Sequence, residues 1–355
     1  MDKYKIDSHK LMHHPERVGN WAQGRSIYPI YMEISPAGAC NHRCTYCGLD
    51  FMGYKPRFLE TRILKDRLRE MGKLGVKSIM YAGEGEPLLH RDITDIIAAT
   101  KRAGIDAAVT SNAVLFNEKL AEAVLPHLTW FKASINAAKP ATYARIHGAR
   151  PGDLDRALKN MAYAAKICRQ RGYSCTLGIQ IILLPENAAE IVLLARKAKD
   201  LGMDYFVVKP YSHNPQSKTR IYKGIKYGKN MDLAEKLEKM NDARFHTIFR
   251  IRAMRKWDEA TRDYKHCLAL PFWAHIDAGG DVWACSMYLT QDEFRLGNIY
   301  KNTFKKIWES PRRARLVRWA AKQLNTDKCR VNCRMDEINR YLWELKNPSA
   351  HVNFI

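Results

Sequence analysis

Three cysteines stand close together early in the chain, in the spacing C-x3-C-x2-C: Cys40, Cys44 and Cys47. They follow a short apolar run at 31–35 that is typical of a β-strand. Thiolates hold iron–sulfur clusters, and three of them leave the fourth iron of a 4Fe–4S cluster open to a ligand. A zinc knuckle and buried structural thiols are the alternatives, but zinc usually takes four ligands in paired C-x2-C spacing. His42 lies between two of the cysteines, which makes it an awkward fourth ligand.

A second set of four cysteines lies near the carboxyl end of the chain. Its first two members frame a glycine in the pattern C-x12-G-x4-C, and its last two form C-x3-C. Four thiolates saturate one 4Fe–4S cluster and leave no open iron. A zinc ribbon is the alternative, although C-x3-C is the less usual spacing for zinc. The four cysteines are Cys267, Cys285, Cys329 and Cys333.

The elements that must position these cysteines alternate in type. Two amphipathic stretches, 61–75 and 188–202, separate short apolar runs and show helical spacing. Strand–helix alternation predicts βαβ units and an α/β fold with a parallel sheet. Six units make a partial (β/α)6 barrel of the TIM type, with its active site at the carboxyl ends of the strands. The expected strands cover 31–35, 78–83, 107–112, 130–136, 175–184 and 205–211.

The alternation stops after Tyr211, which predicts a change of domain. The segment 272–288 reads as a hairpin with Gly279-Gly280 at its turn, and 303–345 reads as two helices around the last cysteine pair. We therefore expect a second, small α+β domain that holds the second cysteine set. The expected organisation is an N-terminal extension (1–30), the barrel (31–211), a basic helical connector (212–259), the small domain (260–345) and a C-terminal tail (346–355).

Composition limits the class of protein. The 355 residues are 46% hydrophobic, which excludes a disordered chain, and no run of about 18 apolar residues predicts a membrane span. The first residues lack the apolar stretch of a signal peptide, so we expect a cytoplasmic protein. In a reducing compartment, clustered cysteines indicate metal binding or catalysis rather than disulfides.

The charge predicts an anionic partner. Lys and Arg number 59 against 37 Asp and Glu, a net charge of +22. Nucleic acid, phosphorylated or nucleotide-linked small molecules and an acidic redox protein all qualify. The basic segment 218–256 contains few aromatic residues on which bases could stack, so nucleic acid is the least favoured of the three.

The first cysteine motif, with the aromatic Tyr46 before its last cysteine, resembles the signature of the radical S-adenosylmethionine (SAM) superfamily. The run 83–87, Gly-Glu-Gly-Glu-Pro, is similar to the GGEP motif of that family, with Glu84 in place of the second glycine. The resemblance implies that SAM binds the open iron and that a flavodoxin or ferredoxin supplies an electron. SAM is then cleaved to a 5′-deoxyadenosyl radical that abstracts hydrogen from a substrate. It further implies SAM contacts from Tyr46, Gly83, Glu84, Gly85, Glu86, Asn112, Lys132, Ser134, Asn136, Gln180 and Lys209.

The second cysteine set resembles the twitch domain, a shortened relative of the SPASM domain. The resemblance implies one auxiliary 4Fe–4S cluster besides the one that binds SAM. Family members that use a cysteine as hydrogen donor make Cys175, at the start of the fifth strand, a candidate catalytic residue. His147, after the fourth strand, is a candidate neighbour of the site.

These observations predict a radical SAM oxidoreductase or epimerase. The charge favours a small anionic substrate, such as a nucleotide-linked or phosphorylated sugar, that is oxidised, epimerised or rearranged. A peptide-modifying maturase is the first alternative, and an enzyme that modifies tRNA or another nucleic acid is the second.

Overall fold

A ten-stranded sheet forms the centre of the molecule, in the order β10-β9-β8-β1-β2-β3-β4-β5-β6-β7. The neighbours from β8 through β1 to β7 are parallel, while β9 and β10 add an antiparallel edge. The computed structural model describes residues 3–354, so the outermost residues of the predicted extension and tail, 1–2 and 355, lie outside it. The strands are β1 Tyr31–Ile34, β2 Ser78–Tyr81, β3 Asp106–Ser111, β4 Leu128–Ser134, β5 Thr176–Ile182, β6 Tyr205–Lys209, β7 His246–Phe249, β8 Trp273–Ile276, β9 Asp281–Trp283 and β10 Arg295–Asn298.

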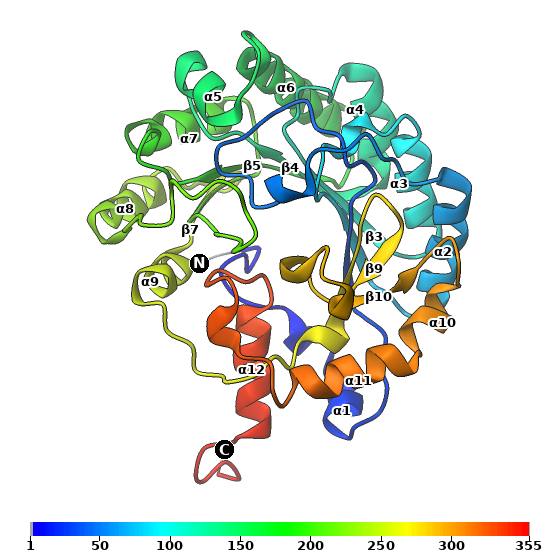
Figure 1. Ribbon diagram of the computed structural model, residues 1–355. Coiled ribbons are helices and arrows are strands. Elements are labelled where there is room, and N and C mark those ends of the chain that lie inside the picture. Colours follow the sequence, from blue (N-terminus) through cyan, green and yellow to red (C-terminus); the bar gives the residue numbers. More distant parts are fainter. Residues whose placement is uncertain (1–2, 355) are drawn as a thin grey trace.

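Helices surround the curved sheet, and α10 to α12 complete the ring on the side opposite α5 and α6 (Figure 1). Helix α2 shows why they form: the Glu60 carboxylate caps its first N–H groups, and Leu64, Leu68 and Met71 bury one face. Within residues 3–354, no helix has the length and apolarity that crossing a bilayer requires. The helices are α1 Pro15–Ala22, α2 Thr61–Lys73, α3 Ile93–Arg102, α4 Glu118–Val124, α5 Pro140–His147, α6 Asp153–Arg171, α7 Ile191–Asp200, α8 Asp232–Glu238, α9 Ile251–Glu259, α10 Phe304–Trp308, α11 Pro311–Ala320 and α12 Asp336–Lys346.

The predicted α/β partial barrel is confirmed, and all six expected strands are present as β1 to β6. The expectation of a helical connector at 212–259 is wrong at 246–249, because these residues form β7 and pair in parallel with β6. Four residues within a polar, basic segment carry too weak a pattern to reveal a strand, and only pairing with β6 selects it. The hairpin of β8 and β9 is confirmed, but β8 also pairs with β1 and so extends the barrel sheet.

The last stretch also differs from expectation, since it forms three helices rather than two. Ser310 caps α11 and Pro311 occupies its first turn, which separates α11 from α10. The cysteine pair lies between α11 and α12, as predicted.

The two faces of each strand have different surroundings. On β4, Phe131 and Ala133 belong to the apolar core beneath the helices, so the alternate residue Lys132 faces the barrel interior. At the amino end of that interior, the N-terminal segment packs Tyr4 and Ile6 against an apolar group on β6 and β7. The segment therefore closes one end of the barrel and leaves the carboxyl ends of the strands for the site.

Candidate active site at the carboxyl ends of the strands

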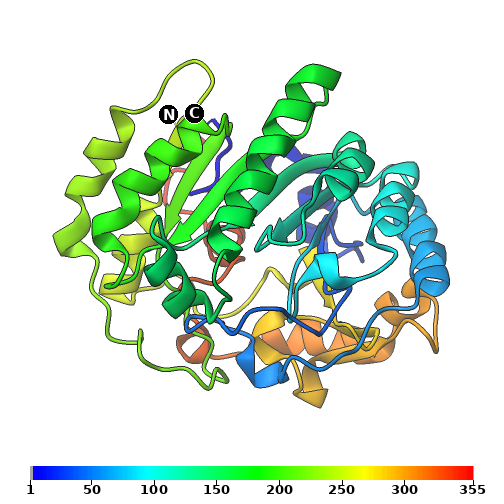
Figure 2. The ribbon, with the colours of Figure 1, turned by 90° about the horizontal axis from the view of Figure 1, so that it is seen from above.

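The loop after β1 carries the first cysteine set at the edge where β9 and β10 also lie (Figure 2). Cys40, Cys44 and Cys47 are free and half-buried. Burial, and then the neighbouring charges of Glu86 and Cys47, raise the pKa of the Cys40 thiol to about 12. Thiols in such a setting ionise only when a cation replaces the proton. The three residues therefore fit a metal cluster.

Glycines bring the end of β2 against this loop. A side chain at Gly85 would place its Cβ 2.2 Å from the carbonyl oxygen of Ala39, so only glycine fits there. Gly83 has a φ of +114°, and a Cβ on it would lie 1.7 Å from Ser35 Oγ. The Glu86 N–H donates to the Ala39 carbonyl at 2.8 Å. The motif that the sequence singled out thus holds the cysteine loop in place.

Both carboxylates of the 83–87 motif already have protein partners. Glu86 accepts from the Ser111 hydroxyl at 2.7 Å and from the Asn112 N–H at 2.9 Å, which joins the ends of β2 and β3. Glu84 accepts from the Ala278 N–H at 2.9 Å and pairs with Arg57 at 3.3 Å, so it faces the β8–β9 turn. Asn112 in turn donates to Asn41 of the cysteine loop at 2.7 Å.

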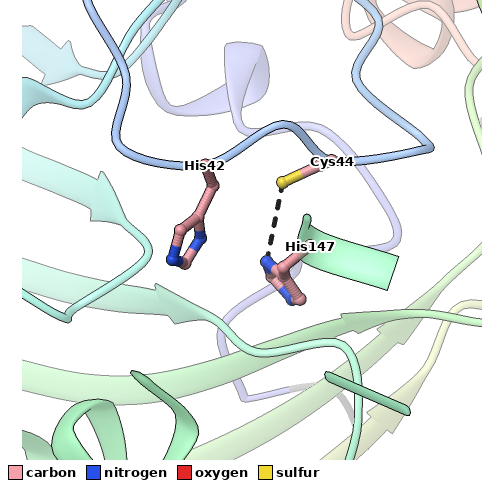
Figure 3. A group of neighbouring side chains, drawn as sticks. All are labelled: His42, Cys44 and His147. Atoms are coloured by element: carbon pink, nitrogen blue, oxygen red, sulfur yellow. Dashed lines mark hydrogen bonds between the residues drawn. The ribbon is translucent and has the colours of Figure 1, made fainter. Parts of the chain in front are cut away.

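A polar network joins the cysteine loop to β4, β5 and α5. The Asn136 amide donates to the Tyr46 hydroxyl at 2.6 Å, and the Asn136 N–H donates to His147 Nε2 at 3.1 Å. The other ring nitrogen of His147 lies 3.5 Å from Cys44 Sγ (Figure 3). The structure thus brings Tyr46, Asn136 and His147 together beside one thiol.

Two lysines face the barrel interior, Lys132 from β4 and Lys209 from β6, the strands on either side of β5. Ser134 on β4 pairs in register with Gln180 on β5, and Ile182 pairs with Lys209 on β6. Burial, and then the nearby charges of Arg334 and Arg250, lower the pKa of Lys132 to about 7, while Glu33 acts in the opposite direction. Burial also lowers the pKa of Lys209 well below its usual value, and the charge of Lys132 adds to the effect. Neither lysine has an ion-pair partner among residues 3–354.

Sequence reasoning missed the charged residues that surround these lysines. Arg334, just after the last cysteine, pairs with Glu33 on β1 at 3.1 Å. Arg250, just after β7, pairs with Asp7 of the N-terminal segment at 3.1 Å. Contacts between segments so distant in sequence leave no local signal, and β7 itself was not expected. The interior therefore carries more positive than negative charge.

The second cysteine set converges in space from three segments. The thiol charges of Cys333 and Cys267 act on Cys285, and Cys333 acts on Cys329, so all four lie near one another. Each thiol also has a hydrogen-bond partner: Met287 N–H on Cys285 at 3.4 Å, Met335 N–H on Cys333 at 3.4 Å, Asn339 Nδ2 on Cys267 at 3.6 Å and the Tyr288 hydroxyl on Cys329 at 3.4 Å.

Cys175, the candidate catalytic residue, does not face the barrel interior, where a hydrogen donor to the substrate would have to lie. Cys175 precedes β5 at the amino end of the strand, opposite the edge that carries the cysteine loop. It packs in the apolar core with Leu177 and Ile179, which share its side of the strand. The alternation of side chains along β5 therefore turns Cys175 toward the helices and away from any substrate.

A cleft of about 490 Å³ opens between the cysteine loop and the β9–β10 region. Its charged lining carries both signs, with Lys55, Arg57 and Lys218 facing Asp277 and Asp292.

Comparison with known proteins agrees with this geometry. Residues 34–198 match the Radical SAM superfamily, and residues 267–334 match the iron–sulfur cluster-binding domain named SPASM. The chain carries a radical SAM domain followed by a SPASM domain. These two domains imply one 4Fe–4S cluster that binds SAM and an auxiliary cluster in the second domain. Radical SAM enzymes need a reductant and a substrate.

Similarity to individual proteins is more limited. A GTP 3′,8-cyclase of Photorhabdus laumondii is 33% identical over 133 residues, which cover 36% of this chain and 39% of the relative. A probable GTP 3′,8-cyclase of Methanosarcina acetivorans is 27% identical over 140 residues, covering 38% of this chain and 41% of the relative. The chain thus spans about two fifths of the length of the curated relatives it matches.

Two solved structures share the fold over most of the chain. Streptococcus suis SuiB, bound to its precursor peptide SuiA, has a TM-score of 0.67 at 17% identity, covering 86% of this chain and 71% of SuiB. The anSMEcpe structure with AdoMet and a peptide has a TM-score of 0.60 at 15% identity, covering 88% of both chains. At this identity the likeness shows a shared fold and says nothing of the substrate.

Proposed function

We propose that this radical SAM enzyme abstracts hydrogen from a small anionic metabolite, with a nucleotide-linked or phosphorylated sugar as the first candidate, and oxidises, epimerises or rearranges it. Cys40, Cys44 and Cys47 would hold the SAM-binding cluster. The auxiliary cluster would be held by Cys267, Cys285, Cys329 and Cys333. A flavodoxin or ferredoxin would supply the electron, since such acidic proteins suit a chain of charge +22.

The observation that carries this proposal is the pair of interior lysines. Lys132 and Lys209 are half-buried, face the space enclosed by the barrel and form no ion pair in the described chain, although the Lys132 ammonium lies 5.3 Å from the centre of the Trp130 ring. Removing such cations from water without an anionic partner costs free energy. An anionic group between them would offset that cost through charge-assisted hydrogen bonds. Arg334 and Arg250 form ion pairs, so they are not free to bind a ligand. Lys132 and Lys209 form no ion pair in the described chain, and nearby Arg330 donates only to the Ser286 hydroxyl, at 3.0 Å, so it adds a third cation.

The chain's own residues would position the reaction. When bound, the cluster and SAM supply a 5′-deoxyadenosyl radical that abstracts hydrogen. Gly85 lets the cysteine loop approach the ends of the strands, and Tyr46 with Asn136 fixes one side of that loop. The lysines of β4 and β6 hold the substrate from within the barrel, and the N-terminal segment closes the far end of the barrel against water.

The names of two relatives support the substrate class. One is named a GTP 3′,8-cyclase and the other a probable GTP 3′,8-cyclase, and GTP is a phosphorylated nucleoside of the kind that two lysines without ion-pair partners in the described chain would hold.

A peptide-modifying maturase is the second candidate. The cleft of about 490 Å³ beside the cysteine loop supports it, because a mixed-charge lining suits an extended peptide. SuiB, which has the same fold, is bound to a precursor peptide.

The test measures 5′-deoxyadenosine formed by the anaerobically loaded, reduced protein with SAM and pools of candidate substrates. A nucleotide-sugar pool should stimulate SAM cleavage, with a shallow dependence on salt because the contacts are buried. In Lys209→Gln, the half-saturating concentration should rise roughly tenfold or more. Lys139→Gln removes an exposed lysine just beyond β4 and should behave as wild type.

Two results would contradict the proposal. Stimulation by total RNA alone, with affinity falling by orders of magnitude between about 50 and 200 mM salt, would indicate nucleic acid. Stimulation by a short peptide, with Lys209→Gln unaffected, would favour the maturase.

A further inference from the structure

His147 lies beside the cysteine loop, fully buried at the end of α5. The carbonyl groups of Ile146 and His147 accept the backbone N–H groups of Thr45 and Arg43, at 2.9 and 3.0 Å. Gly148 allows this approach, since a Cβ there would lie 2.6 Å from the Arg43 carbonyl oxygen. The imidazole is therefore fixed relative to the loop.

The orientation of the neighbouring Asn136 amide follows from its surroundings. The Ile182 N–H lies 2.6 Å from one end of that amide. A backbone N–H can only donate, so this end must be the oxygen. The other end is the NH2 group, which donates to the Tyr46 hydroxyl at 2.6 Å and faces His147 Nε2 at 3.2 Å.

These donors determine the tautomer of His147. Two N–H donors of Asn136, the backbone amide at 3.1 Å and the side-chain amide at 3.2 Å, approach Nε2. Nε2 must therefore be the acceptor, and in a neutral imidazole the proton then lies on Nδ1. Nδ1 is 3.5 Å from Cys44 Sγ and 3.4 Å from the Tyr46 hydroxyl (Figure 3).

We propose that His147 is a positioning residue that donates its Nδ1–H to the Cys44 sulfur and thereby raises the reduction potential of the SAM-binding cluster. Hydrogen bonds to ligand sulfurs help to set the potentials of iron–sulfur clusters. Reduction adds negative charge that is shared with the thiolates, so an N–H donor stabilises the reduced form more than the oxidised form. The inference rests on the proposed role of Cys44 as a cluster ligand.

The same geometry speaks against a separate metal site here. Nitrogens of His42 and His147 and the Cys44 sulfur lie within 4.8 Å of one another. His42 Nε2 donates to the Asp153 carboxylate at 3.1 Å, which leaves its Nδ1 free to accept. A metal on His147 Nδ1, however, would move the proton to Nε2, where it would face two other donors.

The first experiment uses the wild-type holoprotein labelled with 15N-histidine. Pulsed electron paramagnetic resonance of the reduced SAM-binding cluster should detect a weak coupling to one histidine nitrogen. Absence of any histidine coupling would overturn the proposal. The measurement requires no substitution, so a folding defect cannot obscure it.

The second experiment compares midpoint potentials. His147→Phe keeps an aromatic ring against Tyr143, whose ring stacks on His147 at 4.1 Å, but removes the donor. Its SAM-binding cluster should become harder to reduce by roughly tenfold in the reduction equilibrium, which is about 59 mV for one electron. His147→Gln restores an N–H donor and should shift less.

Tyr143→Phe is the matched control, because it removes a hydroxyl without a hydrogen-bond partner in the described chain and keeps the stacking. The auxiliary cluster provides a second control in the same sample. An unchanged potential in His147→Phe at full iron content, or an equal shift in Tyr143→Phe, would overturn the proposal. A stoichiometric non-iron metal that is lost in His147→Phe would do the same. The role of Cys44 as a cluster ligand is tested separately, by replacing Cys44 and measuring the iron content. If the iron is retained, the assignment of Cys44 as a ligand is refuted, whatever the effect of His147.

Discussion

The two cysteine sets are built in opposite ways. The first takes three thiols from eight consecutive residues, yet the histidine beside Cys44 comes from α5, about a hundred residues away in the chain. The second takes its four thiols from three distant segments, yet the donors to them come from those same segments. Met287 and Met335, for example, each donate to the thiol two residues earlier.

The two sites therefore depend on different parts of the structure. The spacing of the first set is local, and the barrel supplies its surroundings through β2, β4 and α5. The second set is assembled by the fold, and a cluster there would link the β8–β9 hairpin to the segment before α12. We therefore expect metal at the first site to matter mainly for chemistry, and metal at the second to matter also for folding.

The largest effect should come from removing the first set. The anaerobically reconstituted protein should hold about eight irons, four for each cluster. Cys40, Cys44 and Cys47 changed together to alanine should leave about four irons and abolish SAM cleavage, because no open iron remains. Iron analysis and 5′-deoxyadenosine formation measure the two outcomes. Retention of all the iron would refute the assignment of this set.

A single substitution should show how far SAM cleavage depends on the position of the cysteine loop, without removing any cysteine. In Gly85→Ala, the new Cβ would collide with the Ala39 carbonyl oxygen and displace the cysteine loop. A misplacement on the order of 1 Å lowers rates by roughly 100-fold, so SAM cleavage should fall steeply while the auxiliary cluster remains. Gly224→Ala is the control, since no atom lies within 4 Å of a Cβ there. Native SAM cleavage in Gly85→Ala would show that the contact is unimportant.

These two sites also show what sequence can predict. The cysteine spacings and the strand–helix alternation predicted both cysteine sets, the parallel sheet and six of its strands, because each is a local pattern. Position at a strand end brought Asn136 and Lys209 into the candidate site. By contrast, three contacts join segments that lie far apart in the sequence, and no local pattern predicts them. They are the Glu33–Arg334 ion pair and the hydrogen bonds that Glu86 accepts from Ser111 and Glu84 accepts from Ala278. The prediction of a catalytic role for Cys175 failed because a side chain beside a strand can face either side of the sheet. In the structure Cys175 packs in the core beneath the helices.

The second set should show a partial effect. Cys285→Ala leaves the first cysteine loop intact, so some 5′-deoxyadenosine should still form without product. Product formation should be lost if the reaction is an oxidation, because an oxidation needs an electron acceptor for the substrate radical and a closed auxiliary cluster can be that acceptor. Since metal and fold are coupled here, circular dichroism must first show that the variant is folded. Product formed at the native rate by a folded variant would make the auxiliary cluster dispensable.

The smallest effect concerns the carboxylate that joins the two regions. Glu84 follows β2 beside the first loop and accepts from the Ala278 N–H in the hairpin turn that leads to Cys285. Burial, and then the charge of Asp277, raise its pKa to about 7, while the Ala278 N–H and Arg57 act in the opposite direction.

An acid whose pKa is higher in the folded state binds more protons folded than unfolded between pH about 4.5 and 7. The contribution of Glu84 to stability should therefore be largest below pH 4.5 and should fall as the pH rises to 7. Glu84→Gln keeps an acceptor for the Ala278 N–H and removes this dependence. The free energy of unfolding of wild type relative to the variant should decline by about 1–3 kcal/mol from pH 5 to pH 8. Glu293→Gln, at an exposed position, is the control and should show no such change. If wild type and Glu84→Gln keep the same difference in unfolding free energy at both pH values, Glu84 is already ionised and the two regions are joined by a constant rather than a titrating contact.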